Sequence, residues 1–398
     1  MDLNYIKDKG RTLHFPALDP RKIKLQSQEE FNKNAKQDYF GASPNIFIGR
    51  FGYPKINVGI LNTEQYNNND APLTWSKENY QIPQIINLRT QLINAQFKVE
   101  IKSFKNKFLE LSQEISLSQK PVDIEINLSK KPSFNTTLHQ DEMPHGCNTK
   151  LKKAIATENI TVPRKVDQLV SDTDAKARAA VEELYKAGFD EHYLTKILSV
   201  GNLGIKTERK LVPTRWSIAA TDDIIGKSII TQIKDYSTID CHKAYFDGYL
   251  GNYYLILLFP DVWQYELFES IITEQTAFAT DYENYYGRKQ YATETAGGYY
   301  AARLAILEKL KQEKKQATVL ALRFVDPNEY VAPLGVWVVR EATRKAIAAK
   351  PIEFADKQLM LDYTLQFIKK KFNYDCSLQL KQSILLDTIK KQKKLFEF

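Results

Sequence analysis

The chain has 398 residues, of which 43% are hydrophobic and 12% aromatic. This composition excludes an intrinsically disordered chain and supplies enough apolar side chains for one large or two ordinary folded domains. The 56 Lys and Arg residues exceed the 48 Asp and Glu residues, and the net charge of +8 permits contact with a polyanion without requiring it.

Cysteine usage and hydropathy narrow the protein class further. Cys147, Cys241 and Cys376 are far apart and form no CxxC pair, so neither a disulfide framework nor a cysteine-based zinc site is expected. The N-terminus has no apolar signal core, and the longest apolar run, residues 253–260, is too short to cross a bilayer. We therefore expect a cytoplasmic protein with no membrane partner.

The first half of the chain mixes strand and helix patterns. Residues 1–40 are polar and weakly patterned, which predicts an N-terminal arm. Residues 45–61 alternate on both sides of Gly52-Tyr53-Pro54, which predicts two strands joined by a turn. Apolar side chains in residues 82–108 recur at spacings of three and four, which favours a helix, whereas residues 122–128 alternate as in a strand.

Helical signals dominate the middle of the chain. Residues 171–189 have Ser171 or Thr173 as a candidate N-cap and Gly188 as a stop, which predicts a helix. A second helix is expected over residues 191–200, and paired strands over residues 237–260.

The last third combines both kinds of element. We expect a helix at 298–312, strands at 318–325 and 335–340, and helices near Thr343 and from residues 357 and 377. The irregular alternation predicts a mixed α+β fold with a helical C-terminal region that ends in an exposed tail. The expected organisation is an arm at 1–40, a region at 41–290, a second region at 291–390 packed on it as one globular unit, and a tail at 391–398.

The first candidate segment for chemistry is residues 209–223. Arg215 beside Trp216 is a combination that holds a phosphate or stacks on a base. Asp222 and Asp223 are expected to open the next helix, where paired acids bind a metal through their oxygens. Simple N-capping by Asp222 is the alternative.

The second segment, residues 281–304, sets charged side chains among tyrosines. Gly297 and Gly298 precede a helix, whose first backbone N–H groups would receive an anion. Arg288, Arg303 and Tyr299 are candidates for phosphate and base contact. Asp281 and Glu283 are candidate catalytic acids.

The third segment, residues 335–346, places Arg340 and Arg344 one helical turn apart, so both could hold one phosphate. Glu341 is either a further catalytic acid or the partner of one of these arginines in a structural salt bridge. Hydrolytic chemistry would have to use such carboxylates, because the sequence has no Walker, HExxH or GxSxG motif. We assign no metal ligands, but Mg²⁺ or Mn²⁺ is a possible cofactor.

The C-terminal tail carries the spacing of a short binding peptide. Gln392, Leu395 and Phe398 stand at positions one, four and seven, with Phe396 between the last two. One tight helical turn would project the apolar side chains to one side, and the motif resembles the clamp-binding PIP box of proteins that bind a sliding clamp (PCNA). The alternative is that Leu395 and Phe398 dock on the protein's own core.

Six blocks of this sequence resemble the archaeal Nre family of DNA repair proteins, and the resemblance covers roughly residues 40–398. The blocks are SPNIFIGRFGYPKINVGIL, SDTDAKARAAVEELYKAGF, LVPTRWSIAATDD, DYENYYGRKQYA, GGYYAARLAILE and PLGVWVVRE. The resemblance implies a role in DNA damage repair, a C-terminal clamp-binding motif and a cytoplasmic, nucleoid-associated location. Some family members carry an N-terminal cysteine-rich zinc motif, which this chain lacks because no cysteine precedes Cys147.

Three hypotheses follow for function. The first is a DNA repair factor that is tethered to the clamp and contacts DNA or a phosphate-bearing ligand through an Arg/Tyr/acid cleft. The second is a carboxylate- or metal-dependent enzyme acting on DNA or a nucleotide, and the third is a recruitment scaffold without chemistry. The sequence leaves the oligomeric state open.

Overall fold

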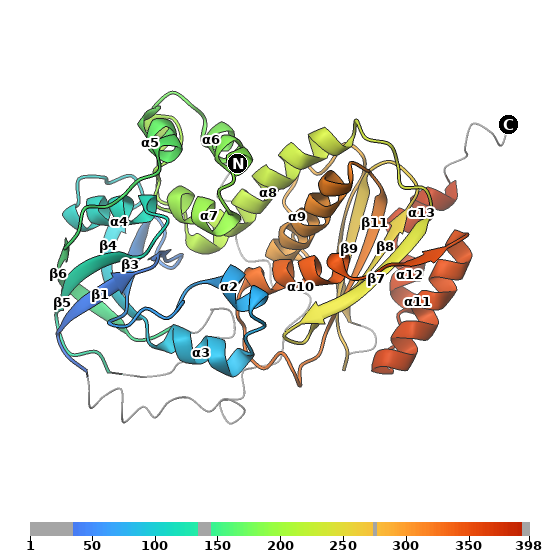
Figure 1. Cartoon of the computed structure of the whole chain (residues 1–398), viewed down its shortest axis with the longest axis horizontal. Coiled ribbons are helices and arrows are strands. Elements are labelled where there is room, and N and C mark those ends of the chain that lie inside the picture. The colour runs from blue at the N-terminus through green and yellow to red at the C-terminus, as the bar shows by residue number, and fades with distance from the viewer. Residues whose placement is uncertain (1–34, 134–144, 274–276, 392–398) are drawn as a thin grey trace. The chain divides into compact units, whose positions relative to one another are not determined.

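The computed structural model describes residues 35–133, 145–273 and 277–391 (Figure 1). The chain divides into two compact units at Ile225 and Gly226. We call them the N-terminal unit, described from residue 35 to 225, and the C-terminal unit, described from residue 226 to 391. The division falls inside helix α8, Thr214–Ile233, and not near residue 290, because strands on both sides of residue 290 pair in one sheet.

A six-stranded sheet forms the frame of the N-terminal unit. Its strand order is β1 (Asp38–Ser43), β5 (Val122–Leu128), β6 (Asn148–Ala156), β4 (Ile93–Glu100), β3 (Lys55–Asn62) and β2 (Ile46–Ile48). Only β4 and β6 run parallel, and the other neighbours are antiparallel. A bridge joins Ala42 at the end of β1 to Thr63 just after β3. Since β1 and β3 are not neighbours in the strand order, this bridge requires the sheet to curl.

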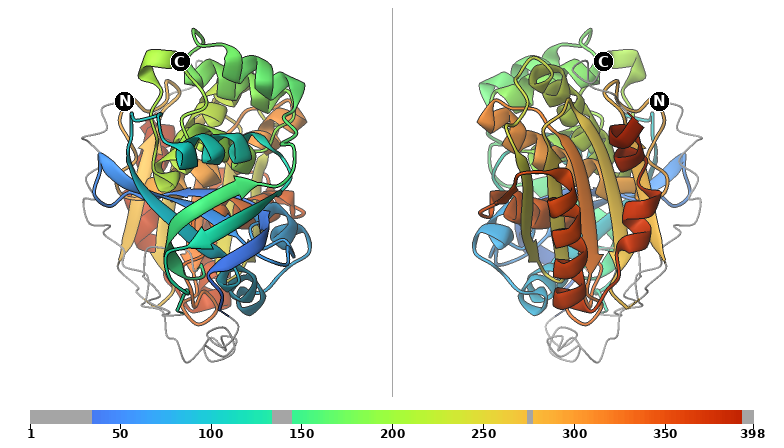
Figure 2. Two further views of the ribbon diagram at one scale, coloured as in Figure 1. Left: turned by 90° about the vertical axis from the view of Figure 1, so that its left-hand side faces the viewer. Right: turned by 90° about the vertical axis from the view of Figure 1, so that its right-hand side faces the viewer.

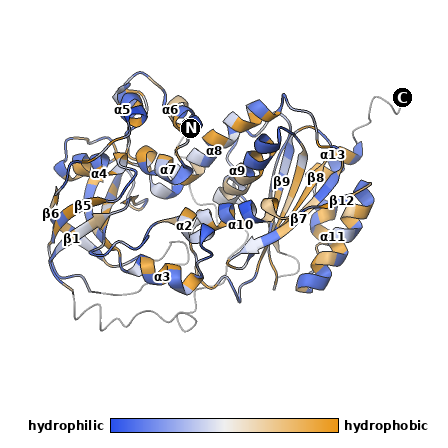
Figure 3. Cartoon of the chain, in the orientation of Figure 1, coloured by the Kyte–Doolittle hydropathy of each residue, from blue (hydrophilic) through white to orange (hydrophobic). Residues whose placement is uncertain are grey.

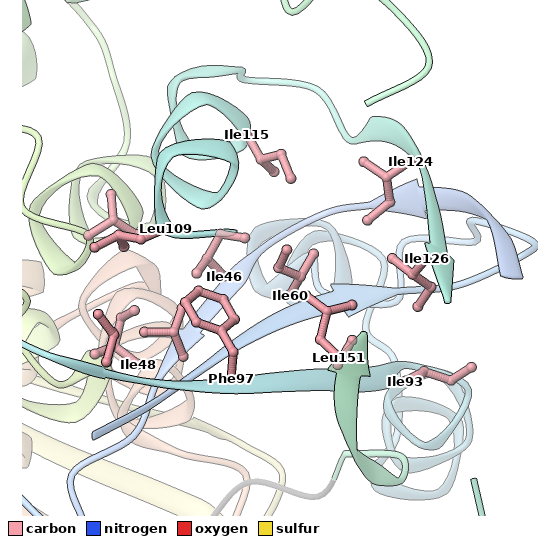
Figure 4. Close-up of a cluster of buried hydrophobic side chains, with 14 of the residues drawn as sticks. Ile46, Ile48, Ile60, Ile93, Phe97, Leu109, Ile115, Ile124, Ile126 and Leu151 are labelled. Carbon is pink, nitrogen blue, oxygen red and sulfur yellow. The ribbon is translucent and has the colours of Figure 1, made fainter. Parts of the chain in front are cut away.

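The concave side of this sheet holds the core of the N-terminal unit. Strands alternate buried and outward-facing residues, as in VDIEINL of β5, where Ile124 and Ile126 are buried. Helix α4, Lys107–Leu117, adds Leu109 and Ile115 to the same cluster (Figure 4). The left panel of Figure 2 shows α4 beside these strands. Asn106 begins the helix by accepting hydrogen bonds from the backbone N–H groups of the second and third helical residues.

The remaining helices of the N-terminal unit are short. They are α2 (Pro72–Lys77), α3 (Ile82–Thr90), α5 (Arg164–Ser171), α6 (Ala177–Lys186), α7 (Glu191–Ser199) and the 3-10 turn η3 (Lys206–Glu208). Helix α7 is buried nearly throughout and contains the buried cation Lys196. Its Nζ donates to the backbone oxygen of Ser118 at 2.7 Å, which satisfies a carbonyl just beyond the end of α4.

A second six-stranded sheet organises the C-terminal unit. Its order is β10 (Phe278–Glu283), β9 (Gln264–Ile271), β11 (Thr318–Val325), β8 (Asn252–Phe259), β7 (His242–Tyr249) and β12 (Ile352–Phe354). Strands β9 and β11 are parallel, and all other pairs are antiparallel. Every residue of β9 and β11 is buried, as expected for central strands covered on both faces.

Helices cover the two faces of this second sheet. On one face lie α9 (Ala296–Glu313) and α10 (Val336–Ala348), and on the other α11 (Lys357–Phe372), α12 (Ser377–Gln382) and α13 (Ile384–Lys391), as Figure 1 and the right panel of Figure 2 show. The α11 face is apolar, with Leu257, Phe324, Met360 and Ile368 in its core. Figure 3 shows hydrophobic residues along β8 and hydrophilic residues interspersed on α11.

A buried carboxylate fixes the last helix to this sheet. Glu266 of β9 accepts hydrogen bonds from the Ser383 hydroxyl at 2.5 Å and from the backbone N–H groups of Ile384 at 3.1 Å and Leu385 at 3.0 Å. It thus supplies the anion that the N-terminus of α13 favours. Burial raises the pKa of this carboxyl above its usual value, and these hydrogen bonds oppose the shift.

Several predicted elements are confirmed. The predicted strands 122–128 and 318–325 coincide with β5 and β11, and the strand pair about Gly52-Tyr53-Pro54 is the antiparallel pair of β2 and β3. The helix at 191–200, the paired strands at 237–260 and the mixed α+β fold are also confirmed. The predicted arm overlaps residues 1–34, which lie outside the described residues, and β1 begins within it at Asp38.

Three predictions were wrong. The helix at 82–108 ends at Thr90, and residues 93–100 form strand β4, because Ile93, Ala95, Phe97 and Val99 are buried on alternate positions. The predicted strand at 335–340 is the start of α10, where burial of consecutive residues makes a helix look like a buried strand. The helix predicted from Ser171 begins only at Ala177.

The physical reason for the late start of α6 lies in a competing turn. Ser171 is the last residue of α5, and the side chain of Asp172 accepts from the backbone N–H groups of Asp174 and Ala175 at 3.0 Å. Strands β6, β9 and β10 were not predicted. Their residues include lysines or carboxylates at positions where apolar residues would have marked a strand.

Lys196 makes the stability of the N-terminal unit depend on pH. Burial lowers the pKa of Lys196 from 10.5 to about 8, while Asp70 and Asp190 act in the opposite direction. Between these values the unfolded chain binds more protons than the folded chain, so this residue makes stability rise with pH. The unfolding free energy of the wild type, relative to that of Lys196→Met, should therefore rise by about 1.5 kcal/mol from about pH 8 to about pH 9.5.

Denaturant unfolding at several pH values in that window measures this difference directly. If the free-energy difference between the two proteins stays constant across the window, the pKa of Lys196 is not lowered by folding.

Candidate functional site

The predicted segments do not all lie in one unit. Residues 209–223 belong to the N-terminal unit, whereas residues 281–304 and 335–346 belong to the C-terminal unit. The last two segments meet on one face of the second sheet. A Cβ atom added at Gly297 in α9 would lie 2.9 Å from Cγ2 of Val336 in α10. Glycine at this position therefore allows the two helices to approach closely.

Asp281 of β10 occupies the start of α9. One of its carboxylate oxygens accepts from the backbone N–H groups of Glu294 at 3.1 Å and Thr295 at 2.8 Å, and from the Thr295 hydroxyl at 2.9 Å. The other oxygen lies 2.9 Å from Nη2 of Arg288. Backbone N–H groups directly before α9 thus already hold an anion that belongs to the protein.

Arg288 organises the loop that leads to this helix. Besides Asp281, its guanidinium donates to the backbone oxygens of Tyr282 at 2.9 Å, Gln290 at 3.3 Å and Tyr291 at 3.3 Å. The side chain keeps 20% of its surface exposed. Arg288 therefore joins a buried carboxylate to a part of the loop that solvent reaches.

Glu283 and Arg303 form an ion pair deeper in the same face. Their side chains are 0% and 1% exposed, and Nη1 of Arg303 lies 2.7 Å from the Glu283 carboxylate. Trp263 donates from its ring N–H to the second carboxylate oxygen at 3.2 Å. A partner on both oxygens is what stabilises a charge that is removed from water.

The tyrosines of this face pack against the arginines. The Tyr299 ring centroid lies 5.3 Å from the guanidinium carbon of Arg288 and 5.6 Å from that of Arg303, within the range of cation–π attraction. Tyr299 is 0% exposed, and burial raises its pKa well above the usual value. Its hydroxyl has no hydrogen-bond partner among the residues that the structure describes.

A third buried network was missed in the sequence. Nη1 of Arg323 lies 2.5 Å from the Glu269 carboxylate, and Nε and Nη2 of Arg323 donate to the side-chain oxygen of Asn252 at 3.2 and 2.5 Å. A Cβ atom at Gly298 would lie 2.5 Å from this carboxylate, so Gly298 lets α9 lie directly over the pair. The sequence feature that could have indicated this network is the presence of charged residues in otherwise buried strands, two glutamates in QYELFESI and one arginine in TVLALRFV.

In the third segment the structure favours the salt-bridge alternative for Arg344. Its Nη1 lies 2.6 Å from Glu341, and its Nε and Nη2 each lie 2.9 Å from an oxygen of Glu308 in α9. Two carboxylates thus hold this guanidinium in a fork geometry. Arg340, one turn earlier, is 1% exposed.

In the N-terminal unit, Arg215 and Trp216 lie in the first turn of α8. The Trp216 ring packs against Tyr53, with centroids 5.5 Å apart. Asp222 and Asp223 lie in the middle of α8 and are buried, so the expectation that they open a helix was wrong. The helix begins earlier because Pro213 precedes it and the backbone oxygen of Pro213 already accepts from Trp216 and Ser217.

Within residues 35–133, 145–273 and 277–391, no three or more His, Cys, Asp and Glu side chains gather in a way that could hold a metal ion. Asp281, Glu283 and Glu341 are each paired with an arginine. The predicted use of Mg²⁺ or Mn²⁺ stays a prediction. No helix in the described part of the chain is both long and apolar enough to cross a membrane.

The predicted clamp-binding residues Gln392, Leu395, Phe396 and Phe398 lie outside the described residues, which end at Lys391 in α13. The described residues do give the point from which the tail starts. Helix α13 is held by Glu266 at its beginning and by Leu385 in the apolar core.

Comparison with known proteins identifies the family. The model of the archaeal Nre N-terminal region matches residues 20–278, and that of the archaeal Nre C-terminal region matches residues 283–398. No solved structure matches the chain.

Named relatives cover most of the sequence. The DNA repair protein NreB of Archaeoglobus fulgidus is 33% identical over 100% of both chains. The DNA repair protein NreA of Haloferax volcanii is 34% identical over 84% of both chains, and NreA of Archaeoglobus fulgidus is 37% identical over 78% of this chain and 80% of its own. The resemblance of the sequence blocks is thereby confirmed, and the chain belongs to the archaeal Nre family.

Proposed function

We propose that this chain is a DNA repair factor that is recruited to a sliding clamp by its C-terminal tail and contacts DNA or a phosphate-bearing ligand through the C-terminal unit. The observation that carries the repair role is the relationship over the full length to proteins named as DNA repair proteins. The proposals of clamp binding and of DNA contact are based on the residues of this chain.

The accessible part of the DNA contact is the loop of residues 284–295. Tyr286 is 88% exposed, Lys289 is exposed, and Arg288 reaches the surface. An arginine, a lysine and an exposed tyrosine suit a phosphate and a base. Among the buried predicted residues, Tyr299 packs against Arg288 of this loop and Arg303 packs against Tyr299, so the contact to a ligand falls to the loop itself. Gly297, Gly298 and Arg340 are buried in α9 and α10.

Recruitment is proposed for the tail motif of Gln392, Leu395, Phe396 and Phe398. Helix α13 ends at Lys391, directly before the motif, and Lys390 and Lys391 add positive charge there. A clamp that encircles DNA would bring these lysines near phosphates. The anchoring of α13 by Glu266 holds the point from which the tail starts in the same unit as the loop of residues 284–295.

A non-catalytic scaffold is the second candidate, and the ion pairs favour it. Asp281 with Arg288, Glu283 with Arg303, and Glu341 with Arg344 use each predicted acid of the C-terminal unit in a contact that stabilises the fold. The enzyme alternative requires that incubation of the protein with DNA and Mg²⁺ or Mn²⁺ yields a covalent change in the DNA. Loss of that product in Glu341→Ala would support it.

The tail makes a direct prediction. Changing Phe396 and Phe398 together to Ala should weaken binding to the purified clamp by tenfold or more, because buried aromatic anchors supply much of the energy of such interfaces. Calorimetric titration of the clamp with both proteins measures this. Leu359→Ala is the matched control, since Leu359 is a 53% exposed apolar residue of the same unit. An unchanged isotherm for the double variant would remove clamp recruitment by the tail.

Arg288 separates ligand contact from a structural role. Arg288→Ala should cost about 1–3 kcal/mol of stability, because the buried Asp281 carboxylate loses one partner. Lys289→Ala removes an equal charge from the same loop. Among the described residues Lys289 forms no ion pair, so this variant should not lose a structural contact. We expect both variants to bind DNA several-fold more weakly, with a lowered melting temperature only for Arg288→Ala.

The two readouts together test the loop. Arg288→Ala could have a lowered melting temperature while both variants bind DNA as tightly as the wild type. The loop would then have only a structural role, and this result would favour the scaffold hypothesis. The measurements are fluorescence anisotropy with labelled DNA at fixed salt concentration and thermal melting of the same samples.

A further inference from the structure

A large aromatic side chain stands exposed at one turn of the N-terminal unit. Phe51, in the turn between β2 and β3, is 68% exposed. The guanidinium carbon of Arg50 lies 4.9 Å from its ring centroid. Single exposed apolar side chains are common on folded proteins, so the meaning of Phe51 depends on the residues that accompany it.

The turn is shaped by its own backbone. Before the turn, the Gly49 N–H donates to the Asn57 backbone oxygen at 2.8 Å. Within the turn, the Lys55 N–H donates to the Gly52 backbone oxygen at 2.9 Å. Gly52 has a φ of +82°, and a Cβ atom there would lie 2.8 Å from the Lys55 oxygen. Glycine is therefore needed for the turn that presents Phe51.

Contacts behind the turn hold it in place. Tyr53 packs against Trp216 with ring centroids 5.5 Å apart. The Ile101 N–H donates to the Pro54 oxygen at 3.1 Å, and the Ile101 oxygen accepts from the Leu211 N–H at 2.9 Å. A platform that is already ordered loses little conformational entropy when a ligand binds.

These contacts also bring a basic segment to the turn. Residues 98–107 continue from β4 through Ile101, the residue bonded to the turn, to the start of α4. Their exposed charged residues are four lysines and one glutamate, and Lys55 lies opposite that glutamate in the register of β3 and β4. The exposed lysines of this segment are Lys98, Lys102, Lys105 and Lys107, and Lys55 at the start of β3 is also exposed.

We propose that this turn is a contact for single-stranded DNA, with the Phe51 ring as a stacking platform for one unpaired base and the surrounding lysines as phosphate contacts. An aromatic face beside a basic path is the combination by which proteins hold single strands without sequence preference. Duplex DNA offers its bases already stacked, so an exposed ring gains less from it. The site uses none of the residues of the 284–295 loop or of the tail, and it goes beyond the proposed function.

Binding of labelled oligothymidine to the full chain tests the stacking contact by fluorescence anisotropy. Phe51→Ala should weaken this binding by about 5- to 100-fold, the range for loss of one stacked base. Phe51→Leu, which keeps an apolar side chain but no ring face, should weaken it likewise, and Phe51→Tyr should retain it. Phe40→Ala is the matched control, because Phe40 is a 57% exposed phenylalanine of the same unit.

The lysines are tested by salt dependence. The variant Lys102→Gln with Lys105→Gln should lower the slope of log affinity against log salt by about 1.4, since single strands release about 0.7 counterion per contact. All of these side chains are exposed, so thermal melting should match wild type and exclude unfolding as the cause.

Three outcomes would overturn the proposal. The wild type could fail to bind oligothymidine, Phe51→Ala could bind as wild type does, or Phe40→Ala could weaken binding as much as Phe51→Ala. A fourth outcome would reassign the surface: loss of binding to anionic phospholipid vesicles in Phe51→Ala with unchanged binding to DNA. Because Arg288→Ala and the tail variant leave the turn intact, these results are independent of those for the proposed function.

Discussion

Buried ion pairs within the second sheet and between that sheet and helix α9 are the constraint on which the C-terminal unit depends. Glu283 with Arg303 and Glu269 with Arg323 place full charges where almost no water reaches them. Removing one partner from such a pair typically costs 3–5 kcal/mol, because the other charge stays buried. Helix α9 and strands β9, β10 and β11 are therefore tied to one arrangement. Gly298 lets α9 lie directly over the Glu269 carboxylate, and Gly297 lets α9 approach Val336 of α10.

This arrangement explains why the charged segments need not all touch a ligand. Asp281 holds the start of α9 and the guanidinium of Arg288, and the loop beyond them reaches solvent. The two faces of the sheet are also different in kind. The α11 face is an apolar core that carries α13, whereas the α9 face sets buried ion pairs among apolar side chains such as Leu304 and Leu307.

The sequence identified many residues of this site, but of their partners it indicated only the pairing of Glu341 with Arg340 or Arg344. Asp281, Glu283, Arg288, Arg303, Glu341 and Arg344 were all selected for their unusual chemistry, and all of them form ion pairs. An ion pair between residues 20 positions apart depends on strand pairing and helix packing, which no local pattern contains. The Glu269–Arg323 pair was missed for the same reason, since each residue by itself is one charge in an apolar strand.

What the sequence determined by itself is local. The alternation of VDIEINL, the turn at Gly52-Tyr53-Pro54 and the family membership were readable because neighbouring residues carry them. The tertiary structure decided whether apolar runs such as GVWVVR become helix or strand, where α8 begins, and which charges neutralise each other. Burial decides these points. A segment that is buried on all sides has no regular alternation of apolar and polar residues, and that alternation is the signal from which helices and strands are predicted.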